Sequence, residues 1–269
     1  MSYVLNNLLV ASGRDAEYDK KLSICLTAEG FSFAEISSRR ELLAFGNASG
    51  GHSSLLIDAT RDIKAFCAES GIRPLSFKHM ELVVVSDESA WVPDEIYTPT
   101  ANRQYLRLVG GKGISALATS CRQLSSTSVF VADEGLVTAF KVAMPGLTVN
   151  NQHVRFASLA PLSGNHPVML AHWRKERVDL AAFRDGRYLY GNTLTFEEEK
   201  TALYQIVEVR RTFGIDDADT ELLLCGDVDR ERYARFRPYF PKTTLFTGTC
   251  SVGHVFRQLH TYRHAVLLS

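Results

Sequence analysis

The sequence VMLAHWRKERVDLAAFRDGRYLYGN at residues 168–192, followed after a helical stretch by ELLLCGD at residues 221–227, decides the fold. An apolar run comes first, and alternating apolar residues then stand before and after Asp185-Gly186. A two-residue hairpin turn needs positive φ at both central positions, which Asp-Gly adopts at little cost. The stretch therefore predicts three consecutive strands, joined by a turn at Lys175-Glu176 and a hairpin turn at Asp185-Gly186.

A helix and a fourth strand are expected to follow these three strands. Thr195 is the expected N-cap of the helix, and the glutamates at residues 197–199 suit the positive end of the helix dipole. Gly214 is the expected stop, because glycine readily adopts the left-handed conformation that ends many helices. The segment at residues 221–227 is short and apolar throughout, which is typical of a buried strand parallel to its neighbours.

The first half of the chain repeats this order of elements. LSICLTAEGFSFAEIS at residues 22–37 alternates about a turn at Glu29-Gly30, and a third strand follows it. Thr60 is the expected cap of the next helix and Gly71 its expected end, after which ELVVVSD at residues 81–87 matches ELLLCGD. The shared order predicts one β-β-β-α-β unit used twice, although two ordinary α/β units could also resemble each other by chance.

Two such units predict an α/β protein with two lobes, at residues 20–160 and 166–269. Residues 88–127 have no counterpart in the second half, so we interpret them as an insertion in the first lobe. Residues 1–20 are interpreted as a polar lead-in with a short docking segment at residues 4–10. The side chains expected in the two lobe cores are Ile24, Phe33, Val84, Leu180, Ile206 and Leu223.

The composition is that of an ordinary globular protein. Of 269 residues, 45% are hydrophobic and 22% charged, and the formal net charge is zero, which argues against general binding to nucleic acid. No apolar stretch reaches the roughly 20 residues needed to span a bilayer, and the N-terminal region lacks the basic start of a signal peptide. The five cysteines are scattered without a CxxC pair, which indicates reduced thiols and a cytoplasmic location.

Four separated motifs give the chain a closer resemblance. Residues 22–37, WVPDEIYT at residues 91–98, VDLAAFRDGRYLYGN at residues 178–192 and ELLLCGD resemble a family of uncharacterised bacterial proteins. That family is known as a domain of unknown function with an actin-like ATPase fold, which contains two ribonuclease-H-like lobes. The resemblance covers about residues 20–250. It implies the duplicated fold, but it implies no activity.

The actin-like ATPase superfamily binds phosphates on the hairpin after the first strand of each lobe, where glycine lets backbone amides approach. The resemblance implies that a retained nucleotide site would use Glu29 and Gly30 on the first hairpin. Gly226 and Asp227 would contribute from the end of the fourth strand in the second lobe, with Asp179 as a metal partner.

The two hairpins depart from that requirement. The first, at residues 27–30, has one glycine and one carboxylate, and the second, Arg174-Lys175-Glu176-Arg177, has no glycine. The glycine-rich VGGKGIS at residues 109–115 lacks the spacing of a phosphate-binding P-loop and is predicted to be a turn. His260 and His264 would share a helix face, but no acidic residue or cysteine stands at metal-ligand spacing, so a solvated basic face is expected.

The sequence therefore favours a binding or scaffolding module with another protein as its partner. On this interpretation it has no catalytic residue, metal ion or cofactor, and it does not bind nucleic acid. The alternative is an ATPase or phosphotransferase with an atypical nucleotide site between the lobes. The hairpin at residues 174–177 discriminates between the two, because four long side chains in place of glycine disfavour an approach of the backbone to phosphate.

Overall fold

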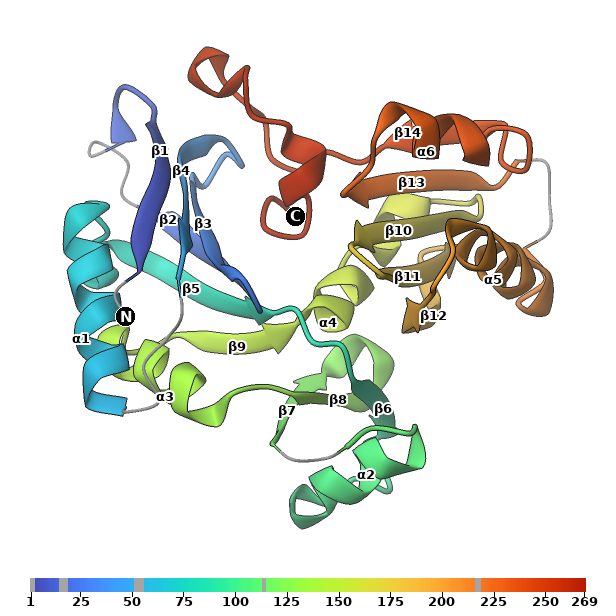
Figure 1. The fold of residues 1–269 in the computed structure, drawn as a ribbon, viewed down its shortest axis with the longest axis horizontal. Helices are drawn as coiled ribbons and strands as arrows, with labels where there is room; N and C mark the ends of the chain where they lie inside the picture. The colour runs from blue at the N-terminus through green and yellow to red at the C-terminus, as the bar shows by residue number, and fades with distance from the viewer. Residues whose placement is uncertain (1–2, 15–18, 51–55, 113–114, 216–218) are drawn as a thin grey trace.

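The structure is a computed structural model that describes residues 3–14, 19–50, 56–112, 115–215 and 219–269. Two large sheets stand side by side, each with helices on its outer face, and the C-terminal segment runs back from the second sheet to the first (Figure 1). The α/β class predicted from the sequence is confirmed.

The first sheet has the strand order β1-β4-β3-β2-β5-β9 (Figure 1). The bounds of its strands are β1 Val4–Val10, β2 Lys20–Thr27, β3 Gly30–Ile36, β4 Leu42–Ser49, β5 Phe77–Val84 and β9 Thr148–Asn151. Strand β3 is antiparallel to β2 and β4, whereas β5 is parallel to β2 and β9.

The second sheet has the order β12-β11-β10-β13-β14. Its strands are β10 Val168–Arg174, β11 Arg177–Arg184, β12 Arg187–Thr195, β13 Glu221–Gly226 and β14 Lys242–Leu245. Strands β10, β11 and β12 are antiparallel neighbours, and β13 is parallel to β10 and β14. The order and the directions match those of β2, β3, β4, β5 and β9 in the first sheet. The segments at the carboxyl ends of β5 and β13 line the same cleft.

The turns of the second sheet form as the sequence predicts. Arg174 pairs with Arg177 across the Lys175-Glu176 turn. Asp185 and Gly186 have φ of 53° and 69°, the positive values that this two-residue hairpin requires. Gly214 has φ of 61°, and its amide bonds back to the carbonyl of Arg211 at the end of the helix.

The first four residues of strand β10 are all apolar because both faces of the strand are buried. Met169 and Trp173 pack with helices on the outer face, whereas Val168 and Leu170 face the other lobe. Burial of both faces removes the period-two signal that a half-solvated strand would show. The same alternation places His172 and Arg174 on the face between the lobes, and this position matters for the site.

Helices cover the outer faces of both sheets. They are α1 Leu56–Glu69 and α3 Glu134–Ala143 on the first sheet, and α5 Glu199–Thr212 and α6 Arg230–Phe236 on the second (Figure 1). The inner faces are covered by an exchange. Helix α4, Gln152–Ala157, leaves the first sheet and packs Phe156 on the second, whereas the C-terminal segment packs Phe256 and Leu268 on the first.

A small third sheet of order β6-β8-β7 lies between β5 and α3 in the chain. Its elements are β6 Ser89–Pro93, α2 Asn102–Leu108, β7 Ala116–Cys121 and β8 Ser126–Val131. Leu106 of α2 packs with Val92 and Val129 to form its core. Because β8 pairs with both β6 and β7, this sheet extends beyond residue 127.

The structure corrects both predicted helix caps. Thr195 is the last residue of β12, where it pairs with Arg177, and the N-cap of α5 is Glu198. Strand β12 continues to Thr195, so α5 begins later than the sequence predicts. Thr60 lies inside α1, where its hydroxyl bonds to the carbonyl of Leu56 at 2.7 Å.

Two other expectations also change. Residues 4–10 form β1, an edge strand paired with β4, and are not a separate docking segment. Leu223 is half-buried against the cluster between the lobes, whereas Ile24, Phe33, Val84, Leu180 and Ile206 are buried as expected. Along β13 it is Leu222 and Leu224 that enter the outer core. Residues 113 and 114 of the glycine-rich turn lie outside the described residues.

Helix α5 provides a direct test of this packing. Ile206 is fully buried, and Tyr204 on the same helix is 65% exposed. We expect Ile206→Ala to lower the free energy of unfolding by about 2–5 kcal/mol, because it removes buried methyl groups and leaves a cavity. Tyr204→Ala should change it by no more than about 0.5 kcal/mol. Urea unfolding with an unchanged slope measures both, and equal losses would contradict the placement of the helix.

Candidate functional site

A cleft of about 680 Å³ opens between the lobes. Its walls include the first hairpin at residues 27–30, the second at residues 174–177, and the strand ends at residues 84–88 and 226–227. The C-terminal segment contributes residues 263, 264, 266 and 267. Of the residues named from the sequence, Glu29, Gly30, Gly226 and Asp227 all line this cleft, and Asp179 lies beneath its surface.

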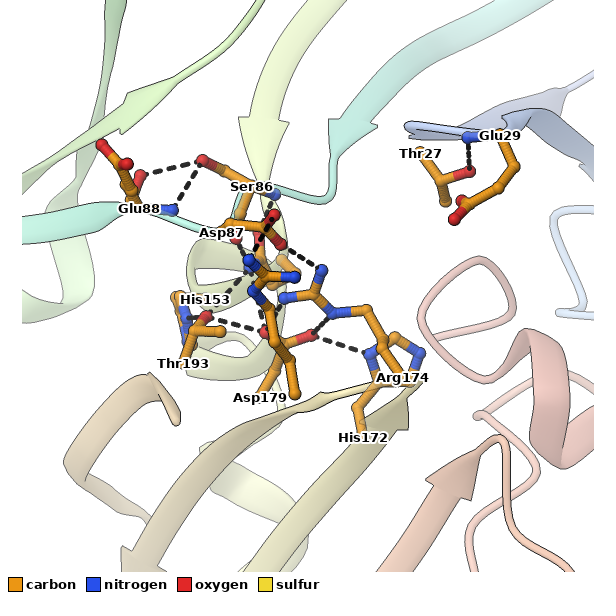
Figure 2. Close-up of polar contacts among 12 residues, drawn as sticks. Thr27, Glu29, Ser86, Asp87, Glu88, His153, His172, Arg174, Asp179 and Thr193 are labelled. Carbon is orange, nitrogen blue, oxygen red and sulfur yellow. Dashed lines mark hydrogen bonds and ion pairs between the residues drawn. The ribbon is translucent and has the colours of Figure 1, made fainter. Parts of the chain in front are cut away.

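Strand packing explains the glycine at position 30 without any ligand. Its φ is 147°, and a Cβ at this position would meet the carbonyl oxygen of Ala48 at 2.2 Å. Glycine is therefore required for close pairing of β3 with β4. The neighbouring Glu29 is exposed, and its amide bonds to the Thr27 hydroxyl at 3.3 Å within the turn. Figure 2 shows the side chains of Thr27 and Glu29 lying apart from the polar cluster around Asp179.

Gly226 is required by packing in the same way. Its φ is 82°, and a Cβ would meet the carbonyl oxygen of Trp173 at 2.1 Å on the adjacent strand β10. The amide of Asp227 donates to that same carbonyl at 2.9 Å, so the end of β13 is bound tightly to β10. The Asp227 side chain is exposed at the cleft. Both glycines are thus explained by contacts between strands.

Asp179 is the centre of a buried polar cluster (Figure 2). Its Oδ1 accepts hydrogen bonds from Arg174 Nη2 at 2.7 Å and Thr193 Oγ1 at 2.7 Å, and a longer one from Gln152 Nε2 at 3.2 Å. Its Oδ2 lies 2.9 Å from both Arg174 Nε and His172 Nδ1. Both oxygens are therefore fully engaged by the protein, which leaves no free lone pair facing the cleft for a metal ion.

The register of the sheet assembles this cluster. His172, Asp179 and Thr193 are direct cross-strand partners on β10, β11 and β12, so their side chains share the face between the lobes. Gln152 arrives from α4 of the first lobe. Burial by itself would raise the pKa of Asp179, but the hydrogen bond from His172 and the charge of Arg174 outweigh it and hold that pKa well below its usual range.

Arg174 connects this cluster to the first lobe. Its Nη1 donates to Asp87 Oδ1 at 2.6 Å, and Arg177 Nη2 lies 3.3 Å from Asp87 Oδ2. Asp87 lies just after β5. The residue before it, Ser86, exchanges two hydrogen bonds with the Gln152 side chain. The arginines that replace glycine in the second hairpin therefore form ion pairs between the lobes.

Sequence reasoning missed this part of the site. It named Asp179 and recognised the charged hairpin, but it did not identify Asp87, Gln152 or Thr193 as their partners. The strand register could have indicated Thr193, because three consecutive antiparallel strands place it opposite Asp179. The contacts of Asp87 and Gln152 join segments that are far apart in the sequence.

His153 lies at the edge of the cluster and is fully buried. The Thr193 hydroxyl donates a hydrogen bond to Asp179. Its oxygen therefore accepts a hydrogen bond from His153 Nε2 at 3.0 Å. His153 Nδ1 has no hydrogen-bond partner within the described structure. Burial, reinforced by the nearby charge of Arg174, lowers the pKa of His153 to about 4 even though Asp179 opposes the shift. The imidazole is therefore neutral near pH 7.

A second polar cluster lies deeper between the lobes. Glu81 accepts from Arg155 Nη1 and Lys21 Nζ, both at 2.9 Å, and from Asn150 at 2.7 Å. Burial would raise the pKa of Glu81, but Arg155 and Lys21 lower it below the ordinary value. Arg155 also bonds to the carbonyl oxygen of Ser269, which fixes the C-terminal segment on the first lobe. Arg155 thereby links the first sheet to the C-terminal segment, and none of these groups lines the cleft.

The predicted histidine face does not form. His264 ends a short 3₁₀ helix, Thr261–His264, and its ring packs on Phe45 with 4.6 Å between centroids. Burial lowers its pKa to about 4, so it is not a basic surface group. Among the described residues, no group of three or more His, Cys, Asp or Glu side chains is arranged to hold a metal ion. Nor does that part of the chain include a helix long and apolar enough to cross a bilayer.

Residues 14–243 match the model of a family described as "Protein of unknown function (DUF3822)". The chain belongs to this family. Its structure is similar to a crystal structure from Bacteroides thetaiotaomicron, a protein of unknown function with an actin-like ATPase fold. The TM-score is 0.68 at 18% identity, over 87% of this chain and 93% of that one. The actin-like ATPase fold expected from the sequence is therefore confirmed.

A second solved structure belongs to the PilM–PilN type IV pilus biogenesis complex. It matches with a TM-score of 0.55 at 11% identity, over 93% of this chain and 97% of that one. At such identities the likeness concerns the fold alone. No curated protein sequence matches the chain significantly.

The carboxyl group of Asp179 provides a test in acid. Because its native pKa lies below the unfolded value near 4, its contribution to stability is present above about pH 4 and is lost as the pH falls further. We expect Asp179→Asn to lower the free energy of unfolding at pH 7 by about 3–5 kcal/mol and to flatten its acid dependence. Urea unfolding from pH 7 to 3 measures this.

The exposed turn residue supplies the control for that test. Asp185→Asn keeps a residue that tolerates positive φ, so it should preserve both the stability and its pH dependence. An Asp179→Asn variant as stable as the wild type at pH 7 would show that the buried cluster does not stabilise the fold.

His153 provides a second test at milder pH. Its native pKa of about 4 lies below the ordinary 6.5, so the unfolded chain binds a proton first and stability declines as the pH falls from about 6.5 to 4. His153→Gln should lose this part of the decline, roughly 3 kcal/mol at pH 4, while the part due to His264 remains. Exposed His254→Gln should behave as the wild type. Identical slopes for all three proteins between pH 7 and 4.5 would contradict the neutral, buried state of His153.

Proposed function

We propose that this protein is a non-catalytic binding or scaffolding module that uses an actin-like ATPase fold to bind another protein. The observation that carries the proposal is the second hairpin. At the position where the superfamily brings backbone amides to phosphate, this chain has Arg174 and Arg177, both paired with Asp87 of the first lobe. These paired side chains occupy the space through which a phosphate would have to reach the backbone of the hairpin.

The remaining residues of a nucleotide site support the same proposal. Gly30 and Gly226 are required for strand packing, so neither glycine is evidence for a ligand. Asp179 has no lone pair left for a metal ion, because five donors surround its two oxygens. Exposed carboxylates remain at Glu29 and Asp227, on opposite walls of the cleft and without a paired cation at hydrogen-bond distance among the described contacts.

Protein binding is supported by analogy with the pilus complex, in which a protein of similar fold is part of a PilM–PilN assembly. The shared strand order of the two large sheets supports an internal duplication of one β-β-β-α-β unit. All five cysteines are free thiols, which supports a reducing, cytoplasmic location.

One observation favours the alternative, an ATPase or phosphotransferase with an atypical site. The cleft has the volume of a small-molecule site and is lined by Glu29, Gly30, Gly226 and Asp227. Nucleotide binding would have to rely on side chains in place of a glycine-rich loop. This alternative makes a different prediction for the response to ATP.

We expect millimolar Mg-ATP to raise the melting temperature by less than about 1 °C. A ligand at 100 times its dissociation constant stabilises the native state by about 2.7 kcal/mol, which corresponds to roughly 5–10 °C in a chain of this size. Differential scanning fluorimetry, with MgCl₂ alone and ATP alone as references, makes the measurement. A saturable rise of several degrees that Glu29→Gln or Asp227→Asn abolishes would establish the nucleotide site instead.

Glycine variants are unsuitable for that control, because a side chain at Gly30 or Gly226 would clash with backbone. The binding role is tested by purifying the tagged protein from its native cell. A partner at fixed stoichiometry that stays bound in EDTA supports the module. Recovery of the protein alone, with a nucleotide bound to it, would contradict it.

A further inference from the structure

We propose that Arg174 and Arg177 form an oxyanion-binding site between the lobes, which Asp87 occupies from within the chain. The ligand class is a small oxyanion, such as a phosphate or a carboxylate group. In the protein as it folds, the carboxylate of Asp87 takes the place of that ligand. The proposal goes beyond the proposed function, because it concerns anion binding by the two arginines and the role of the Asp87 carboxylate in preventing it.

Arg174 is held ready for this role by a buried carboxylate. Its Nε and Nη2 bond to the two oxygens of Asp179 at 2.9 and 2.7 Å, which is the bidentate arrangement of a guanidinium with a carboxylate. Because Asp179 is fully buried, the orientation of the arginine is fixed before any ligand arrives. Its Nη1 is then directed out of the cluster, where it meets Asp87 at 2.6 Å.

Arg177 supplies the second cation. Its Nη2 lies 3.3 Å from Asp87 Oδ2, and its Nε is buried without a hydrogen-bond acceptor. One carboxylate outside the cluster thus serves two guanidinium groups, and their donors outnumber its acceptors. A guanidinium pair with unfilled donors matches a phosphate group, which offers more oxygens than a carboxylate does.

On this proposal, the position of Asp87 prevents external anions from reaching the two arginines. The backbone of the preceding residue, Ser86, is fixed by Gln152, with its amide 3.0 Å from Oε1 and its carbonyl 2.5 Å from Nε2. An anchored carboxylate acts at a high effective concentration, so a free anion in solution competes poorly with it. The Asp87 side chain is nevertheless 46% exposed, so it can swing away without disturbing a core.

Other charges at the cleft limit what the site accepts. Lys175 at the tip of the hairpin favours an anion, whereas Glu176 beside it and Glu29 and Asp227 on the walls oppose one. A compact anion that reaches only the two arginines avoids most of this repulsion. Removal of the Asp87 charge should therefore create measurable affinity for such an anion.

Isothermal titration calorimetry with pyrophosphate, without metal ion and at low ionic strength, tests the proposal. We expect Asp87→Asn to bind pyrophosphate at least about tenfold more tightly than the wild type. Asp227→Asn is the matched control, because this aspartate holds the corresponding place after β13 and no described ion pair joins its carboxylate to an arginine. Its gain in affinity should be much smaller than that of Asp87→Asn, because only a more distant repulsion is removed. Adding Arg177→Gln to Asp87→Asn should return the affinity to the wild-type level.

Three results would overturn the proposal. They are an Asp87→Asn affinity within twofold of the wild type, an equal gain in Asp227→Asn, and a gain that survives Arg177→Gln. Circular dichroism melting confirms folding of each variant, and Asp87→Ser replaces Asp87→Asn if the amide still satisfies Arg174. The Mg-ATP experiment leaves Asp87, Arg174 and Arg177 unchanged, so a failure here and a failure of the binding-module proposal are distinguishable.

Discussion

The buried carboxylate of Asp179 is the constraint on which the region between the lobes depends. An ionised group with no solvent exposure is costly unless all its lone pairs are satisfied. Arg174, His172 and Thr193 from the same sheet and Gln152 from the other lobe provide this compensation. Each donor is held in one place as a consequence, and Arg174 in turn determines where Asp87 lies. A single buried charge thereby orients the arginine that meets Asp87 across the cleft.

The exchange of terminal segments has a similar effect on the packing of the lobes. Helix α4 covers the inner face of the second sheet, and the C-terminal segment covers the inner face of the first. Each sheet therefore buries part of its inner face under an element of the other lobe, which couples the stability of the two lobes. Glu81 and Arg155 add a buried ion pair at this junction, and Arg155 also binds the carbonyl of Ser269.

These constraints also involve the two hairpins, which bind phosphate elsewhere in the superfamily. A nucleotide-dependent fold needs a flexible, glycine-containing backbone at that place and lobes that can separate. Here the second hairpin bears arginines that join the lobes, and the glycine of the first is required for pairing of β3 with β4. The actin-like ATPase fold is retained, and ion pairs connect its second hairpin to Asp87 of the first lobe.

The sequence by itself determined the order and type of the main elements. Asp185-Gly186 predicted a hairpin and Gly71 and Gly214 predicted helix ends, because these signals depend on local backbone energetics. ELLLCGD was correctly predicted as a parallel strand, because its apolar run indicates burial on both faces. Thr195 and Thr60 misled, because strand β12 and helix α1 extend through these residues, and neither extension has a local signal at the predicted cap.

Only the tertiary structure decided what surrounds the candidate residues. The sequence brought Glu29, Gly30, Gly226 and Asp227 to one cleft through the topology alone. It could not show that Asp179 is saturated by donors or that Asp87 pairs with both arginines of a hairpin 87 residues from it. Such contacts arise from the packing of one lobe on the other, and no short-range pattern encodes the relative position of two sheets.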